Sequence, residues 1–198
     1  MLREEARTVV AEKGWTMEAL DSMWVLDSFF RETRRTRPHT DSIYFPHHFL
    51  PIPSTQTDGC RREAILNRLV LKPTTLSDGT HLTPGTQVSV AYGARESDPR
   101  YYPSPATFDP LRFYKLRTDR SSNRFSVTDI DSNEYLGFGG GRNTCPGRFF
   151  AVAIIKTAVV QLLLEYDMTP GCDPMELTSK FEDQCLPSFK DRVKFRKL

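Results

Sequence analysis

Apolar side chains recur at helical spacing in two segments near the start of the chain. Residues 2–13 place Leu2, Ala6 and Val9 on one face and charged side chains elsewhere, which predicts an amphipathic helix. Residues 21–36 repeat apolar positions every three to four residues, and Pro38 follows them. Because proline cannot continue a helix, this pattern predicts a second helix that ends before Pro38.

The rest of the chain changes character several times. Residues 39–60 contain several prolines and no sustained period, which predicts an atypical insert. Residues 66–93 alternate like short strands separated by turns, and residues 95–120 resemble an aromatic, proline-rich meander. Residues 137–165 combine a glycine-rich loop with an apolar helix, and residues 167–198 predict strands and turns. The fold class expected is therefore mainly α with a small β-sheet.

Composition excludes several classes of protein. The 198 residues carry 27 Lys and Arg against 25 Asp and Glu, so a formal net charge of +2 excludes a dedicated nucleic-acid binder. The longest apolar run, residues 149–164, is interrupted by Lys156 and Gln161, so we expect no membrane span and a chain soluble as written. The four cysteines form no C-x-x-C pair, which favours a reducing compartment (Cys60, Cys145, Cys172 and Cys185).

The strongest chemical signal is the glycine-rich loop that ends in a cysteine. Three glycines, Gly139–Gly141, let the backbone approach a flat ligand closely. Cys145 precedes Pro146, which favours the first turn of a helix, so its sulfur is expected at a helix N-terminus that stabilises a thiolate. Such a thiolate can ligate a metal, whereas a lone cysteine is often only a small buried hydrophobe. These residues alone leave both interpretations open.

The loop resembles the haem-binding signature of the cytochrome P450 family. Phe138, Gly141, Cys145 and Gly147 match the signature's phenylalanine, glycine, cysteine and glycine, and residues 148–151 look like its filamentous-fungal version. The resemblance implies that Cys145 is the axial thiolate ligand of the iron of haem b, with Phe138 and Gly141 as further cofactor-binding residues.

A second match lies in the helix at residues 21–36. Glu32 and Arg35 resemble the family's E-x-x-R pair, and Arg112 in FDPLRFY matches the arginine that completes a Glu-Arg-Arg triad. Alone, Glu32 and Arg35 would more commonly form a solvated pair on a helix surface. The resemblance implies instead a structural triad that specifies the fold.

The chain also departs from the family pattern. The basic residue expected two positions before the cysteine is Asn143 here, and Arg142 stands one place earlier. The resemblance implies that the haem propionates are bound by Arg142, by Arg68, or by both. The stretch from Pro38 to Arg68, which includes the insert 39–60, is longer than its counterpart in the family.

The resemblance implies a single partial domain over residues 1–198, the C-terminal portion of the P450 fold. The implied activity is a haem-thiolate monooxygenase that oxidises a small organic substrate with O₂ in fungal secondary metabolism. NADPH-cytochrome P450 reductase would supply the electrons on the cytoplasmic side, where full-length relatives are anchored to the endoplasmic reticulum.

The family's acid and alcohol for proton delivery would lie upstream of Met1, so no catalytic residue is assigned within this chain. Two alternatives remain open. The chain could be a truncated, catalytically inactive remnant that binds haem weakly or not at all. It could also be a small soluble interaction protein in which the cysteine loop is structural.

Overall fold

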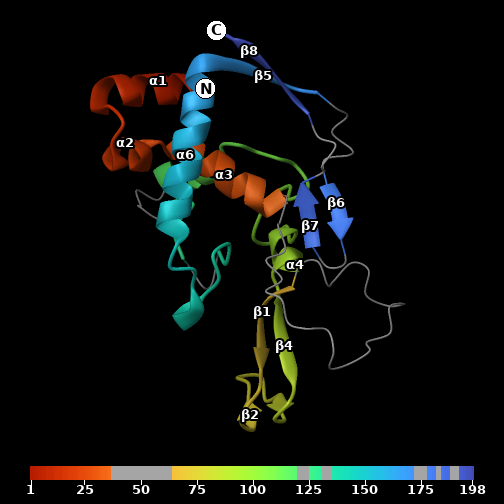
Figure 1. Ribbon diagram of the computed structural model, residues 1–198. Helices are drawn as coiled ribbons and strands as arrows, with labels where there is room; N and C mark the ends of the chain where they lie inside the picture. The colour runs from red at the N-terminus through yellow and green to blue at the C-terminus, as the bar shows by residue number, and fades with distance from the viewer. Residues whose placement is uncertain (37–63, 120–124, 131–134, 172–177, 182–183, 188–191) are drawn as a thin grey trace. The chain divides into compact units, whose positions relative to one another are not determined.

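The computed structural model describes residues 1–36, 64–119, 125–130, 135–171, 178–181, 184–187 and 192–198 (Figure 1). The predicted insert 39–60 and Pro38 lie outside the described residues. The chain divides into two compact units. Unit 1 comprises Met1–Arg37, Ala106–Ser179 and Leu186–Leu198, and unit 2 comprises Pro38–Pro105 and Lys180–Cys185.

Unit 1 begins with three helices, α1 (Leu2–Lys13), α2 (Met17–Ser22) and α3 (Trp24–Thr36). The first matches the helix predicted over residues 2–13, but the single helix predicted over 21–36 is wrong at its start. The chain leaves the helical conformation at Met23, with φ −81° and ψ 80°, and resumes it at Trp24.

The break before α3 is stabilised by a residue far away in the sequence. The two carboxylate oxygens of Glu5 accept hydrogen bonds from the backbone N–H groups of Val25 at 2.8 Å and Leu26 at 2.9 Å. These N–H groups belong to the first turn of α3, where a helix has no intrahelical acceptors. Burial raises the pKa of Glu5, and the two backbone hydrogen bonds oppose that rise.

The core of unit 1 lies between these helices and α6 (Arg148–Glu165), which runs beside α1 and α2 (Figure 1). Five buried apolar side chains form it: Ala6, Leu20, Met23, Leu26 and Val160. The sequence of α6 is apolar on nearly all sides, but the helix is not buried on all of them. Within the described part of the chain, α1 and α2 cover one side of α6, and Phe149, Phe150, Ile154 and Ile155 are exposed.

A buried cluster of charges also connects the helices of unit 1. Asp27 of α3 contacts Lys156 of α6 at 2.8 Å and Arg117 at 3.4 Å, and all three side chains are less than a tenth exposed. Lys156 Nζ also donates to the carbonyl of Leu20 at 2.7 Å. Burial raises the pKa of Asp27, while the charge of Lys156 and its hydrogen bond lower it, with a net upward shift.

The meander predicted over residues 95–120 is not irregular throughout, because part of it is helical. In unit 1, α5 (Arg112–Asp119) packs against α3. Ser28 joins the two helices, since its hydroxyl donates to the carbonyl of Pro110 at 2.7 Å and accepts from the N–H of Phe113 at 3.1 Å. The Phe113 ring of α5 also lies 4.6 Å from the guanidinium carbon of Arg31 on α3, a partner that local composition does not reveal.

Among its described residues, unit 2 holds two separate two-stranded sheets. Strand β1 (Ala64–Leu69) pairs antiparallel with β4 (Gln87–Ala91), and β2 (Thr74–Thr75) pairs antiparallel with β3 (His81–Leu82). The short helix α4 (Tyr92–Glu96) follows β4. Strands thus form within the segment expected over residues 66–93, but as two separate two-stranded sheets and not as one small sheet.

The remaining strands lie near the C-terminus. β5 (Tyr166–Pro170) pairs antiparallel with β8 (Val193–Lys197), and β6 (Thr178–Phe181) forms a two-stranded sheet with β7 (Gln184–Pro187). The fold is mainly helical with small antiparallel sheets, as the sequence predicts. Among the described residues, the helices fall short of the combined length and hydropathy needed to cross a bilayer.

Candidate functional site

The glycine-rich loop before α6 folds back on itself through backbone hydrogen bonds. The N–H of Gly139 donates to the carbonyl of Leu136 at 2.8 Å, and the N–H of Cys145 donates to the carbonyl of Phe138 at 2.9 Å. Gly139 and Gly141 have φ of +81° and +63°, a region that side chains disfavour. The glycines therefore permit the turn that brings Cys145 back beside Phe138.

Cys145 lies just outside the helix that follows it. The first helical residue of α6 is Arg148, with Gly147 as N-cap, so the expected location of Cys145 at the helix N-terminus is only approximate. Pro146 and Gly147 form a turn between the cysteine and the helix. The thiol is free and exposed. An exposed sulfur is thus presented at the surface of unit 1 by a backbone that hydrogen bonds hold in place.

Arg148 connects the cysteine to a neighbouring segment. Its guanidinium donates to the carbonyl of Cys145 at 2.9 Å and to the carbonyl of Thr128 at 3.0 Å, and it lies 4.1 Å from the centre of the Phe149 ring. The Cys145 peptide is consequently held on both sides, through its N–H by Phe138 and through its carbonyl by Arg148.

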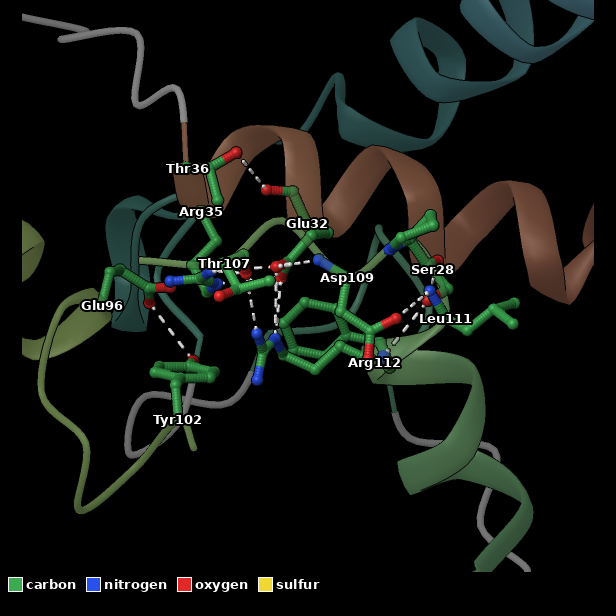
Figure 2. Close-up of polar contacts among 12 residues, drawn as sticks. Ser28, Glu32, Arg35, Thr36, Glu96, Tyr102, Thr107, Asp109, Leu111 and Arg112 are labelled. Carbon is green, nitrogen blue, oxygen red and sulfur yellow. Dashed lines mark hydrogen bonds and ion pairs between the residues drawn. The ribbon is translucent and has the colours of Figure 1, made fainter. Parts of the chain in front are cut away.

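Glu32, Arg35 and Arg112 come together in the buried interior of unit 1 (Figure 2). Arg35 donates from Nε and Nη2 to the two oxygens of Glu32 at 2.8 and 2.9 Å, the two-pronged geometry that strengthens an arginine–carboxylate pair. Arg112 donates from Nε to the same carboxylate at 3.2 Å. The side chain of Glu32 is 0% exposed, that of Arg35 2% and that of Arg112 10%.

Backbone groups complete this network. The N–H of Asp109 donates to Glu32 at 3.0 Å, and the carbonyl of Thr107 accepts from Arg112 at 3.0 Å and from Arg35 at 3.4 Å (Figure 2). Burial raises the pKa of Glu32, but the hydrogen bonds from Arg35 and Asp109 and the charges of both arginines outweigh it, so the pKa is lowered. Glu32 is therefore a carboxylate that holds α3, α5 and the 107–109 segment together.

The structure places the residues predicted from the sequence in three locations. Phe138, Gly141, Arg142 and Cys145 share the loop before α6, with Arg142 exposed in the short 3₁₀-helix η2 (Gly141–Asn143). The triad lies at the α3–α5 contact. Arg68 lies on β1 in unit 2, opposite Val88 of β4, so it belongs to a different compact unit from the cysteine loop.

Sequence reasoning missed several residues that support the site. Asp27 and Arg117 flank Lys156, and the interruption of an apolar run by Lys156 was the one signal that could have revealed this cluster. Arg34 was also missed. Its guanidinium donates to the carbonyl of Gly137 and lies 4.6 Å from the centre of the Phe138 ring.

Comparison with known families and structures agrees on one assignment. The family described as Cytochrome P450 matches residues 64–195. Cytochrome P450 monooxygenase 71 of Postia placenta is 39% identical over 167 residues, which is 84% of this chain and 29% of the relative. Cytochrome P450 monooxygenase avaH of Aspergillus versicolor is 38% identical over 189 residues, which is 92% of this chain and 36% of the relative.

One solved structure, described as retinoic acid bound cyanobacterial CYP120A1, shares the fold with a TM-score of 0.64 at 24% identity. It is matched over 100% of this chain and 38% of its own. The chain thus spans about a third of the length of the curated relatives it matches, between 29% and 36%.

Proposed function

The chain belongs to the cytochrome P450 family, and from this premise we propose that Cys145 binds the iron of haem b for the oxidation of a small organic substrate by O₂. The observation that carries the proposal is the exposed, free thiol of Cys145 at the end of a loop whose backbone is fixed from both sides.

The residues present fit a flat metal cofactor. A thiolate is a soft ligand suited to haem iron, and it is the ligand that P450 enzymes use. At Gly141, a built Cβ meets no atom within 4 Å, so the loop has open space beside it. A glycine-lined surface next to an exposed sulfur is what close approach of a planar ring requires.

Within the proposed site, the chain's own residues bind and orient. Cys145 supplies the ligand sulfur, and its N–H and carbonyl are held by Phe138 and Arg148. Arg142, exposed in the same loop as Cys145, supplies a guanidinium group for a propionate of the cofactor. When bound, haem with a thiolate ligand supplies oxygen activation, because the thiolate donates electron density that favours O–O cleavage.

The same proposal extends to partners. NADPH-cytochrome P450 reductase supplies the electrons, and the substrate is a small molecule of fungal secondary metabolism. Similarity to monooxygenases of Postia placenta and Aspergillus versicolor supports a monooxygenase of fungal type. The reaction takes place on the cytoplasmic side of the endoplasmic reticulum, where the resemblance places full-length relatives.

The test is reconstitution of the purified chain with haem, followed by a carbon-monoxide difference spectrum of the reduced protein. We expect the band typical of thiolate ligation, and we expect Cys145→Ala to lose it. A matched control replaces the other three cysteines by serine and should keep the band (Cys60, Cys172 and Cys185). A thiolate band that persists in Cys145→Ala would overturn the assignment of the ligand.

A second candidate is haem binding without coupled turnover. It is favoured by the exposure of Phe149 and Phe150, at 56% and 73%, in the helical turn that follows the cysteine. An uncovered site admits water, and exclusion of water is part of productive oxygen chemistry. Reconstituted chain with reductase and NADPH should then release peroxide in place of product. Product formation that matches NADPH consumption would favour the monooxygenase over this candidate.

A further inference from the structure

Two arginines of α3 face the segment that leads into the cysteine loop. Arg31 Cζ lies 4.0 Å from the centre of the Tyr135 ring, and Arg34 Cζ lies 4.6 Å from the centre of the Phe138 ring. Arg31 and Arg34 are three positions apart on the helix, and Tyr135 and Phe138 are three positions apart on the segment. Since residues three apart share one face of a helix, α3 contacts residues 135–138 at two successive points.

The backbone between these points is held as well. The guanidinium of Arg34 donates to the carbonyl of Gly137. A Cβ built on Gly137 would lie 2.4 Å from Cζ of Tyr135, so this backbone rests directly against the tyrosine ring. Arg31 lies over the same ring and is only 2% exposed, and its guanidinium also lies near Phe113 and Phe125. Gly137 is consequently confined between Tyr135 and Arg34.

The contact with Arg34 continues to the cysteine through one hydrogen bond. Phe138, whose ring lies under the guanidinium, uses its carbonyl to accept the N–H of Cys145 at 2.9 Å. We propose that Arg34 is a positioning residue that fixes the backbone of Cys145 through Gly137 and Phe138. The inference rests on the proposed function of Cys145 as iron ligand, and it adds a residue outside the family signature and outside the Glu32 triad.

Neighbouring arginines of α3 have different partners. Arg35 is directed at Glu32 and the carbonyl of Thr107, so it supports the α3–α5 contact. Arg34 is directed at the cysteine loop. A planar guanidinium can stack on a ring and donate to a carbonyl at once, whereas a lysine ammonium can donate but stacks poorly. Lysine should therefore replace Arg34 only in part.

The experiment compares Arg34→Met, Arg34→Lys and the control Thr33→Ala. Methionine keeps the length of the side chain but removes the charge, the donor and the stack. Thr33 lies on the same helix, and its hydroxyl bonds the carbonyl of Phe29 within that helix. Two properties are measured for each variant. The first is hydrogen exchange of the Cys145 amide in the chain without haem, and the second is the fraction of thiolate band after reconstitution and reduction under carbon monoxide.

We expect Arg34→Met to exchange the Cys145 amide about tenfold faster, the equivalent of losing one hydrogen bond's stabilisation. Its thiolate band should fall in favour of a non-thiolate form, while haem uptake persists. Arg34→Lys should lie between the wild type and Arg34→Met, and Thr33→Ala should match the wild type in both measurements.

Wild-type values in Arg34→Met, for both exchange and spectrum, would overturn the proposal. Equal acceleration of exchange throughout α3 and α6 would also overturn it, because the residue would then act on general stability. If the wild-type chain itself shows no thiolate band, the proposed function fails. Hydrogen exchange in the haem-free chain still decides whether Arg34 fixes the backbone of Cys145.

Discussion

The Glu32 network and the cysteine loop lie in the same unit, yet they differ in which of their groups are hydrogen-bonded and which are exposed. Around Glu32, both carboxylate oxygens accept charged donors, a backbone N–H adds a further bond, and the side chains are almost entirely buried. At the loop, the hydrogen bonds fix the backbone of Cys145 but leave its thiol exposed, next to exposed Phe149 and Phe150.

This difference separates a structural motif from a chemical one. A buried carboxylate is tolerated only when its partners are present, because an unpaired charge in the interior is costly. The Glu32 network must therefore be complete within the fold. An atom that is to bind a metal, as proposed for the Cys145 sulfur, has the opposite requirement, since its lone pair must stay accessible. The loop stabilises the peptide on either side of the sulfur and leaves the sulfur available.

Removing the central carboxylate should have the largest effect. Glu32→Gln leaves Arg35 and Arg112 buried against a neutral group, so the free energy of unfolding should fall by about 3–5 kcal/mol. Urea unfolding followed by circular dichroism measures this. Glu4→Gln is the matched control, because Glu4 and Arg7 form an exposed pair with the same i,i+3 spacing as Glu32 and Arg35. The control should change by less than about 0.5 kcal/mol.

The same variant tests a pH dependence. The pKa of Glu32 is lower in the fold than in the unfolded chain, so its contribution is fully present above its ordinary value of about 4.3. That contribution is lost as the pH falls through the folded value. Urea unfolding from pH 7 to pH 3 should show a steeper loss for the wild type than for Glu32→Gln. Parallel curves would contradict the lowered pKa.

Lys156→Met should be the next most damaging change. It leaves Asp27 buried with Arg117 as its remaining charged partner in the cluster, and it frees the carbonyl of Leu20. We expect a loss of about 3 kcal/mol near neutral pH, measured by urea unfolding. The loss should shrink as the pH falls, because the pKa of Asp27 is raised and protonation neutralises the carboxylate that has lost Lys156. A loss that is constant with pH would contradict this account.

Gly137→Ala should have an intermediate effect, on the loop side of the comparison. The new methyl group would lie 2.4 Å from Tyr135, a ring enclosed by Arg31, so about 1–3 kcal/mol of stability should be lost. Gly147→Ala is the matched control, since a Cβ there meets no atom within 4 Å and its φ is −81°. Thermal unfolding of the haem-free chain compares the two. Equal shifts in Tm would contradict this expectation, because the Tyr135 ring would then move aside with no loss of stability.

Cys145→Ala should have the smallest effect on stability. The thiol is exposed, so the free energy of unfolding should change by less than about 0.5 kcal/mol, in contrast to Glu32→Gln. The thiolate–haem spectrum should nevertheless be lost. Urea unfolding of the haem-free variant, paired with its carbon-monoxide spectrum, checks both expectations. A large loss of stability would show that the sulfur packs as a structural residue.

The sequence alone predicts different parts of the Glu32 network and of the cysteine loop. The i,i+3 spacing of Glu32 and Arg35 is enough to predict a pair on one helix, and the glycines before Cys145 predict a tight loop. The approach of Arg112 to Glu32 came from family resemblance, because nothing local connects positions 80 residues apart. The role of Cys145 as haem ligand stays a prediction.

Other features escaped because they depend on packing between distant segments. Lys156 was visible as a charge in an apolar run, but its partner Asp27 is chosen by how α3 and α6 pack. The break at Met23 has no adjacent proline or glycine to announce it. Hydropathy predicts that the apolar faces of α6 should be covered, but it does not identify which segment covers each face, so the exposed face was not predicted.

The two hydrogen bonds that the Glu5 carboxylate accepts from the first turn of α3 affect the expected order of folding. Forming the first turn is the unfavourable step of helix formation, because the backbone of several residues must be fixed before the hydrogen bonds that stabilise it can form. Here the acceptors for that turn are delivered by α1, from 20 and 21 residues away. Docking of α1 should therefore precede or accompany nucleation of α3, so that the two helices form in one cooperative event. The helix that carries Glu32, Arg34 and Arg35 should therefore form together with α1, the twelve-residue helix at the start of the chain.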